Sequence, residues 1–585
     1  MSDPVRSRVT AAPRTPKTES ATARRAGVAV LLLLASGACA APETADLVLT
    51  GGKVVTVDDA LPEAEAVAVR GDRIAAVGSA DEIAALVGPE TEVIELDGRL
   101  VVPGFIEGHG HYMALGRARM ILDLTAVESW EEIVAMVGAA AENATPGTWI
   151  HGRGWHQEKW TSVPAGSVEG VPTHHTLSAV SPDNPVLLGH ASGHAAFANL
   201  AALEAAGIGP DTPDPAGGTI VRDADRNATG LLRENADGLV ARVAAAADEA
   251  RSEEERRAEF RRQVELAGEE AIRKGVTTFQ DAGADFSTID GFRSLADEGA
   301  LPVRLYVMVR ASTEEMRERL AEYRMVGYGD DFLTVRSIKR QIDGALGSHG
   351  AWLLEPYFDM PTTLGLAVEE PDDIEATAAL ALEHDYQLNT HAIGDRANRE
   401  VLDIYERTFG SDGSGLRWRI EHAQHLHPDD VGRFASLGVI ASMQGVHATS
   451  DAPWIPIRLG AERTRSGAYI WRELLNAGVT INNGTDVPVE DISPIASFAA
   501  SVHRIDRNGE VFFADQRMTR MEALRSYTIN NAYAAFEEDL KGSITPGKLA
   551  DLVVLDRDIM TVPLEEIART MVDYTIIGGE VRHAR

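Results

Sequence analysis

Eight short apolar runs, separated by segments with helical spacing, constrain the fold of this 585-residue chain more than any other feature. Runs of this length are typical of buried strands, and their alternation with helices is typical of βα units around a parallel sheet. Eight such units predict a closed (β/α)8, TIM-like barrel of class α/β. An open, doubly wound sheet is the alternative, because a strand count alone does not exclude it. The runs cover residues 100–106, 276–280, 303–309, 335–342, 387–391, 418–422, 439–444 and 479–483.

The two ends of the chain contain short strand-like segments without intervening helices. Two of them have the pattern of β-hairpins that turn at glycine, at residues 46–57 and 66–77. Isolated hairpins are marginally stable in water, so the two ends are expected to fold together. We predict a small β-sandwich domain from residues 45–100 and 540–585, with the barrel over residues 101–539.

A long segment interrupts the barrel pattern after its first strand. About 165 residues separate the first and second predicted strands, whereas βα loops usually have 2–6 residues. This stretch has its own Trp-, His- and Gly-rich pieces and a helical segment at 253–274. We therefore predict an inserted lid subdomain over residues 112–274, above the barrel mouth.

The N-terminus has the layout of a secretory signal. A polar, Arg-containing segment precedes an apolar run at 26–35 that is too short to span a bilayer comfortably, and small residues follow it. Cys39, the only cysteine, lies four residues after the end of this run, and 36–39 resembles a lipobox except for Ser36. We expect residues 1–40 to be a signal peptide of an exported protein. The protein is then either periplasmic or a lipoprotein anchored to the membrane through a lipidated Cys39. An uncleaved tail is the alternative.

Composition excludes several classes of function. Lys and Arg number 55 against 89 Asp and Glu, a net charge of −34, and this sign of charge disfavours nucleic acid as a partner. With one cysteine the chain forms no internal disulfide and no Cys-rich zinc module. A metal site would depend on His, Asp or Glu. A homo-oligomer is compatible with these features, and none of them requires it.

One local motif suggests a metal site. His109 and His111 stand two residues apart at the end of the first predicted strand, so their side chains project to the same face. Two imidazoles placed in this way reach one divalent ion at about 2.0–2.1 Å. Further candidates lie in or directly after later strands, and the carboxyl ends of all barrel strands converge on one mouth. These candidates are Lys339, His391, His422 and Asp486.

The order of these residues resembles the amidohydrolase superfamily of metal-dependent hydrolases. The shared pattern is His-x-His on strand one, Lys on strand four, His on strands five and six, and Asp after strand eight. The segment 542–552, near the C-terminus, also fits the superfamily. The segments 193–194 with 199–200, 343–348 and 390–395 are similar to the amidohydrolase-3 branch, which includes N-substituted formamide deformylase. The resemblance covers residues from about 45 to 585. One departure is Gly445, where the branch more often has Pro before the following His, and no role is assigned to His447.

The resemblance implies a ligand set for one or two divalent ions, with Zn²⁺ expected. His109, His111 and Asp486 would hold one ion, and His391 and His422 a second. A free Lys339 ammonium cannot bridge two ions because it has three donors and no acceptor. A carboxylated Lys339 would be an anion with two ligand oxygens. The alternative is an ordinary ion pair between Lys339 and a carboxylate such as Asp343.

The resemblance also implies a reaction. Metal-activated hydroxide would attack an amide carbonyl, with Asp486 as general acid and base. The expected substrate is a small-molecule amide, an N-acyl or N-formyl amine. Trp155, His194 and Gln424 are candidate substrate contacts. The alternatives are a cyclic amide or lactone hydrolase, a deaminase, which Lys339 disfavours, and a non-catalytic exported binding or regulatory protein.

Overall fold

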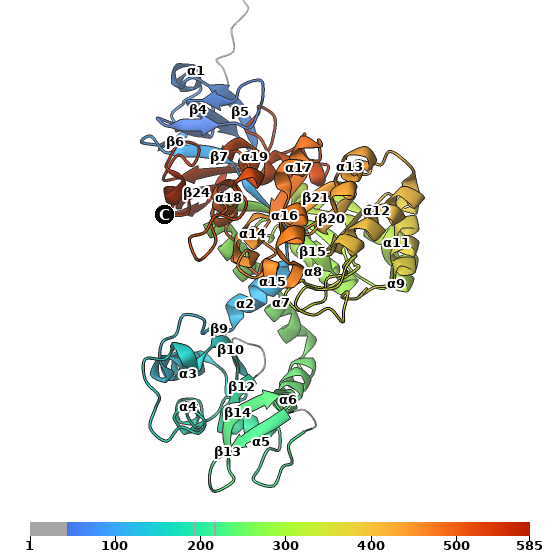
Figure 1. Ribbon diagram of the computed structural model, residues 1–585. Coiled ribbons are helices and arrows are strands. Elements are labelled where there is room, and N and C mark those ends of the chain that lie inside the picture. Colours follow the sequence, from blue (N-terminus) through green and yellow to red (C-terminus); the bar gives the residue numbers. More distant parts are fainter. Residues whose placement is uncertain (1–43, 191–194, 216–217) are drawn as a thin grey trace, which may run out of the picture. The chain divides into compact units, whose positions relative to one another are not determined.

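A computed structural model describes residues 44–190, 195–215 and 218–585 (Figure 1). The predicted signal segment at 1–40, including Cys39, and the candidate His194 lie outside the described residues. The export prediction therefore stays a prediction. Among the helices of the described residues, none has the length and apolar character that crossing a membrane requires.

The middle of the chain forms the predicted barrel. Successive strands pair in parallel around one sheet, with helices between them, and β17 (Met325–Gly327) pairs antiparallel with β18 at one side. The closed (β/α)8 prediction is confirmed. The barrel strands, in spatial order, are β8 (Phe105–Gly110), β15 (Val276–Ala284), β16 (Arg304–Val309), β18 (Leu333–Gln341), β19 (Gln387–Ala392), β20 (Arg419–His422), β21 (Ile440–Gln444) and β22 (Ile481–Gly484).

The barrel closes where the last strand meets the first. The backbone N–H of Asp486 donates to the His109 carbonyl at 2.7 Å, and that of His111 donates to the Val487 carbonyl at 2.8 Å. A Cβ on Gly484 would lie 2.5 Å from the His109 nitrogen, so only glycine permits this approach. The closing seam thus brings the residues after β22 against the His-x-His motif.

The predicted first strand, 100–106, is wrong in its boundaries. Residues Leu100–Pro103 form β7 in another sheet, and the barrel strand β8 begins at Phe105. Pro103 has no N–H for a continuous ladder, and the N–H of Gly104 donates to the Asp551 carbonyl at 2.8 Å. The chain therefore changes sheet at Pro103-Gly104, and His109 lies inside the barrel strand.

Amphipathic helices cover the outside of the barrel. In α12, for example, Val401, Leu402 and Tyr405 are buried on one face. Helix α9 begins at a capping box between Ser312 and Glu315. The helices are α8 (Phe286–Asp297), α9 (Thr313–Tyr323), α11 (Pro371–Glu383), α12 (Asp395–Phe409), α13 (Pro428–Leu437), α14 (Gly445–Asp451), α15 (Ile455–Leu459), α16 (Ala461–Gly467), α17 (Trp471–Asn476), α18 (Pro494–His503), α19 (Arg520–Ser526) and α20 (Ile529–Ala534).

Helix α20 hydrogen-bonds with the amino-terminal part of the barrel. The Asn531 amide donates to the carbonyls of Ile106 at 2.6 Å and Asn483 at 2.8 Å, which joins β8 to β22. The carbonyl of Ala534 accepts from Arg419 at 2.6 Å. These bonds satisfy buried polar groups that could find no water there.

Strands from both chain ends form two further sheets around a shared apolar core (Figure 1). One has the order β5-β4-β1-β6 and the other the order β25-β24-β23-β7-β2-β3. The strands are β1 (Leu47–Thr50), β2 (Lys53–Val55), β3 (Glu63–Ala64), β4 (Ala66–Arg70), β5 (Arg73–Gly78), β6 (Glu92–Glu95), β23 (Leu552–Leu555), β24 (Val572–Ile577) and β25 (Glu580–Ala584); the short helices α1 (Ala80–Ala84) and α21 (Leu564–Ile567) accompany them.

Of the two predicted hairpins, one is confirmed and one is wrong. Strands β4 and β5 pair antiparallel, as predicted for 66–77. Strands β1 and β2, predicted to pair within 46–57, belong to different sheets. A Cβ on Gly52 would lie 2.4 Å from the Arg99 carbonyl, so this glycine lets the chain pass close to a neighbouring segment as it changes sheet.

The segment between β8 and β15 has its own sheet, with strand order β13-β14-β12-β11-β10-β9, and its own apolar clusters. Helices α2 and α7 connect it to the barrel strands, and Gly116 allows α2 to approach the Gln263 backbone closely. Its elements are α2 (Tyr112–Met120), β9 (Leu122–Asp123), α3 (Trp130–Asn143), β10 (Ile150–Trp155), α4 (His175–Val180), β11 (Val186–His190), β12 (Ala195–Ala198), α5 (Leu200–Ala205), β13 (Gly218–Arg222), β14 (Ala228–Glu234), α6 (Asp237–Glu249) and α7 (Glu253–Arg273).

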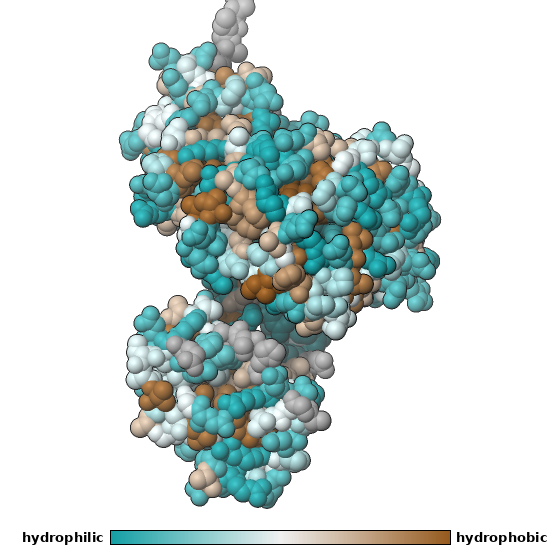
Figure 2. All heavy atoms as spheres, in the orientation of Figure 1, coloured by the Kyte–Doolittle hydropathy of each residue, from teal (hydrophilic) through white to brown (hydrophobic). Residues whose placement is uncertain are grey.

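The surface is dominated by hydrophilic residues on the face drawn in Figure 2, with smaller apolar patches between them. This agrees with the excess of carboxylates in the composition. Single exposed apolar side chains are normal on a folded protein.

A buried ion pair fixes the barrel to the sheet that contains β23. Arg304, at the start of β16, donates to both carboxylate oxygens of Asp551 at 2.9 and 3.2 Å. The Gly578 N–H donates to the same carboxylate at 2.9 Å. Both charged side chains are almost fully buried, so each depends on the other for its solvation.

Replacing Asp551 with Ala is expected to lower the free energy of unfolding by about 3–5 kcal/mol, because it leaves the buried Arg304 cation without its carboxylate partner. Chemical denaturation followed by circular dichroism measures the loss. Glu580→Ala, which removes an exposed ion pair with Arg582, is the control and should cost less than about 1 kcal/mol. Equal effects of the two variants would contradict the assignment.

Candidate metal centre

Among the described residues, two groups of side chains offer ligand atoms close enough together to hold a metal ion. One consists of His109, His111 and Asp486, and the other of His422, His447 and Asp486. In each group the ligand atoms lie within 4.8 Å of one another. Asp486 is common to both, so the groups form one centre.

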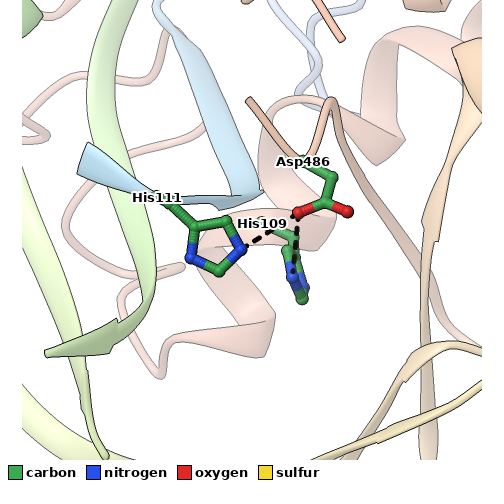
Figure 3. A group of neighbouring side chains, drawn as sticks. All are labelled: His109, His111 and Asp486. Carbon is green, nitrogen blue, oxygen red and sulfur yellow. Dashed lines mark ion pairs between the residues drawn. The ribbon is translucent and has the colours of Figure 1, made fainter. Parts of the chain in front are cut away.

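The first group lies at the closing seam of the barrel. Figure 3 shows both histidine side chains pointing toward the Asp486 carboxylate. The distances from Asp486 Oδ1 are 3.2 Å to His111 Nε2 and 3.6 Å to His109 Nε2. His109 is fully buried, whereas His111 is partly exposed at the end of β8. The sequence prediction that strand one and the segment after strand eight meet is therefore matched by the geometry.

Hydrogen bonds at Nδ1 orient two of the imidazoles. His109 donates from Nδ1 to Glu421 Oε2 at 2.5 Å, and His422 donates from Nδ1 to Gln444 Oε1 at 2.8 Å. Each of these acceptors places the ring proton on Nδ1, so Nε2 carries a lone pair that can bind a cation. Burial, together with the positive charge of Lys339, lowers the pKa of His109 to about 4. Burial also lowers the pKa of His422, so both rings are neutral near pH 7.

Glu421 is buried beside His109 and Arg419. Burial by itself would raise its pKa, but His109, Arg419 and Lys339 outweigh burial and lower the pKa to about 2. The carboxylate is therefore ionised. Glu421 therefore acts as a hydrogen-bond acceptor for His109. Because it is buried, it is not a solvated charge at the end of the strand.

The Asp486 carboxylate is ionised and aimed into the centre. Burial opposes its charge, but the neighbouring His111, His109 and His422 rings hold its pKa well below the ordinary value. The preceding residue, Thr485, donates its N–H to Glu107 Oε1 at 2.6 Å and its hydroxyl to Oε2 at 3.1 Å. Glu107, on β8, thus fixes the backbone that carries Asp486.

Backbone strain is concentrated at the same place. His422, Ala423 and Asp486 have φ angles of 76°, 43° and 59°, in the left-handed region that non-glycine residues rarely adopt. Such conformations cost about 1–3 kcal/mol each and cluster at functional sites. Here they turn the chain sharply after β20 and β22 and direct the side chains of His422 and Asp486 to one place.

Lys339 extends from β18 into the centre. Its Nζ lies 3.2 Å from His109 Nε2, and within the described part of the chain it forms no ion pair with a carboxylate. Burial lowers its pKa to about 8, although Glu421 and Asp486 act in the opposite direction. The predicted alternative, an ion pair with Asp343, is therefore not observed.

His391 occupies a different position from the other histidines. Its ring centroid lies 4.4 Å from that of His422, but its Nε2 faces Asp343 Oδ1 at 3.5 Å. Asp343 is buried and accepts backbone N–H groups of Trp352, Ile393 and Gly394 at 2.8–3.0 Å. Asp343 therefore holds the segment that follows His391.

The candidate substrate contacts lie in different environments. Trp155 is buried in the insert core, where its indole N–H donates to the Leu188 carbonyl at 2.9 Å, and its contacts there are those of a packing residue. Gln424 lies near the centre with its amide nitrogen 3.2 Å from His447 Nδ1. His194, as stated above, is not among the described residues.

Several residues of the centre were not predicted from the sequence. His447 follows β21 at the carboxyl end of the seventh barrel strand, and this position could have identified it despite the preceding Gly445. Glu107 and Gln444 lie on barrel strands but had no motif that singled them out. Their role depends on partners from other strands, which a local pattern does not contain.

The donor set fits a divalent ion. The neutral imidazoles of His109 and His422 lie beside the ionised Asp486 carboxylate, and such a donor set is the ligand chemistry of zinc and similar ions. Among the described residues, Asp486 Oδ1 and His447 Nε2 are buried without a satisfying hydrogen bond. A cation bound by Asp486 would remove the cost of leaving its carboxylate oxygen unsatisfied.

Comparison with known proteins agrees with this geometry. The family model described as "Amidohydrolase family" matches residues 92–583. The chain is 34% identical over 550 residues to Protein LONG AFTER FAR-RED 3 of Arabidopsis thaliana, covering 92% of this chain and 91% of that one. It is 29% identical to N-substituted formamide deformylase of Arthrobacter pascens, covering 92% and 98%.

A solved structure has the same arrangement of elements. The structure is that of an uncharacterized metal-dependent hydrolase from Pyrococcus furiosus, with a TM-score of 0.70 and 26% sequence identity. The match covers 88% of this chain and 100% of the other.

Replacing Glu421 with Leu is expected to weaken metal binding about 10–100-fold, because His109 loses the acceptor that orients its ring. Glu421→Gln retains an acceptor oxygen and is expected to lose less. Competitive titration against a chelator measures both affinities, with thermal melting as a check on folding. If Glu421→Leu binds zinc as tightly as the unaltered protein, Glu421 does not orient a ligand.

Proposed function

The chain belongs to the amidohydrolase family and is a metal-dependent hydrolase, and we propose that it hydrolyses the amide bond of an N-acyl or N-formyl amine. The observation that carries the proposal is the buried, ionised Asp486 carboxylate, 3.2 Å from His111 and 3.6 Å from His109. Support for the substrate class comes from the similarity to N-substituted formamide deformylase along nearly the whole chain.

We propose that His109, His111 and Asp486 hold one divalent ion, with Zn²⁺ as the expected metal. Such an ion lowers the pKa of water and polarises a carbonyl group. His422, whose Nδ1 donates to Gln444 so that Nε2 carries a lone pair, is a candidate for a second ligand set. Glu421 and Gln444 keep the two imidazoles in the tautomer that ligation needs.

Asp486 is proposed to carry the proton. As an ionised carboxylate it can accept the proton of the attacking water. The same carboxyl group can then give that proton to the amine nitrogen when the C–N bond breaks. Its pKa is low in the resting protein, so it begins the reaction in the basic form.

Lys339 is proposed to be carboxylated. Only an unprotonated amine reacts with CO₂, and burial, which lowers the pKa of Lys339 to about 8, increases the fraction of that form. The product is an anion that could ligate ions held by the histidines. The position of Nζ, 3.2 Å from His109 Nε2, supports this role.

The function is tested by a panel of N-formyl amines, N-acyl amines, cyclic amides and lactones, each with added Zn²⁺ or Mn²⁺ and amine release or ring opening as the readout. We expect hydrolysis of linear amides, loss of activity with a chelator and recovery when metal is added. Asp486→Asn should lower kcat by about 10²–10⁴, because the proton carrier is lost.

If the protein hydrolyses only the cyclic substrates, the proposed substrate class is wrong, and the protein is a cyclic amide or lactone hydrolase. Full activity of Asp486→Asn would overturn the proton-carrying role. A control is Asp551→Asn, which keeps a carbonyl acceptor at the buried pair outside the centre and should leave kcat unchanged.

Lys339→Ala is expected to reduce bound metal per chain, measured by elemental analysis, because a bridging anion is lost. Carbon-13 NMR after incubation with labelled bicarbonate should show a carbamate signal in the unaltered protein and not in the variant. Lys53→Ala, in the sheet of β2, is the control and should retain both metal and signal. Unchanged metal content in Lys339→Ala, with no carbamate signal in either protein, contradicts carboxylation.

A further inference from the structure

His447 is a buried histidine at the metal centre whose bonding differs from that of His109 and His422. It lies on α14, directly after β21, and its side chain is almost completely enclosed. Its ring lies nearly parallel to that of His422, at 10° and 6.4 Å between centroids. In the part of the chain that the structure describes, its Nε2 has no hydrogen-bond partner.

The second nitrogen of the ring determines what this Nε2 can do. The amide nitrogen of Gln424 lies 3.2 Å from His447 Nδ1. An amide N–H only donates, so Nδ1 must be the unprotonated acceptor, and the proton of the neutral ring is on Nε2. His109 and His422 are the reverse case, because Glu421 and Gln444 offer them acceptors at Nδ1. Gln424 thus leaves His447 with a hydrogen-bond donor at Nε2. His109 and His422 instead have a lone pair at Nε2 that could bind a metal ion.

The Nε2–H of His447 needs an acceptor in the centre. The ligand atoms of His422, His447 and Asp486 lie within 4.8 Å of one another, but His447 forms no hydrogen bond with either residue. A buried donor without a partner is costly, and at a functional site its partner can be a group of the substrate.

We propose that His447 donates a hydrogen bond from Nε2 to the carbonyl oxygen of the substrate amide, and that Gln424 is a positioning residue that fixes the required tautomer. When water attacks the carbonyl carbon, the C=O π electrons move to the oxygen, which becomes negative and accepts this hydrogen bond more strongly. A preplaced donor therefore stabilises the transition state more than the bound substrate. This inference rests on the proposed hydrolysis of an amide.

The test compares His447→Phe with His447→Gln, which keeps an amide donor. We expect His447→Phe to lower kcat about 10²–10³-fold with a smaller change in KM, and His447→Gln to recover part of the loss. Metal content by elemental analysis should be unchanged in both. Loss of metal from His447→Phe would make the residue a ligand, and unchanged kcat would make it a packing residue. Either result overturns the proposal.

Gln424→Leu tests the tautomer. It should lower kcat less than His447→Phe does, and the double variant should be no worse than His447→Phe alone, because Gln424 acts only through His447. Additive losses would show that Gln424 acts independently. Thermal melting and metal content establish that each variant is folded.

Binding of inorganic phosphate, a tetrahedral oxyanion, to the metal-loaded protein separates this inference from the proposed function. Calorimetry should show about tenfold weaker phosphate binding in His447→Phe than in the unaltered protein, since one charge-assisted hydrogen bond is worth about 1.5 kcal/mol or more. If no amide is hydrolysed but phosphate binding depends on His447, the proposed function is wrong, whereas the inference that His447 is a hydrogen-bond donor is supported. Equal phosphate affinity in the two proteins would contradict the proposed donor role of His447.

Discussion

The centre depends on the seam that closes the barrel. Two backbone hydrogen bonds, from Asp486 to His109 and from His111 to Val487, join the segment after the last strand to the first strand. Glu107 strengthens the seam by accepting both polar hydrogens of Thr485. Because these bonds involve the chemically active residues or their neighbours, closure of the fold and assembly of the first ligand group are one event. A barrel that failed to close would separate Asp486 from both histidines.

Burial gives the assembled residues their chemistry. Removal from water disfavours charge on His109 and His422, and so leaves neutral imidazoles with available lone pairs. The same burial would also neutralise Asp486, but the surrounding histidines keep it ionised. The result is one anionic oxygen among neutral nitrogen donors, an arrangement that attracts a divalent cation. Partner atoms from neighbouring strands then decide which ring nitrogen faces the centre.

The fold could be predicted from the sequence where the signal is periodic. Apolar runs that alternate with helices are local features, and they located all eight barrel strands in order. The errors occurred where the chain changes sheet, at Pro103-Gly104 and at Gly51-Gly52. In both places strand-forming residues continue across the break, but the two sides of the break pair with different strands. Periodicity within the chain contains no information about that partner.

The sequence by itself determined the residue types of the centre and the strands that carry them: paired histidines on one strand, and Lys339, His422 and Asp486 at later strands. Only the tertiary structure decided how each side chain is used. His109 is oriented by Glu421, 312 positions away, and His447 by Gln424, a residue of another strand's loop. The tautomer of a histidine is set by the group opposite its second nitrogen. That group is supplied by the packing of strands, so no local motif could distinguish a ligand from a donor.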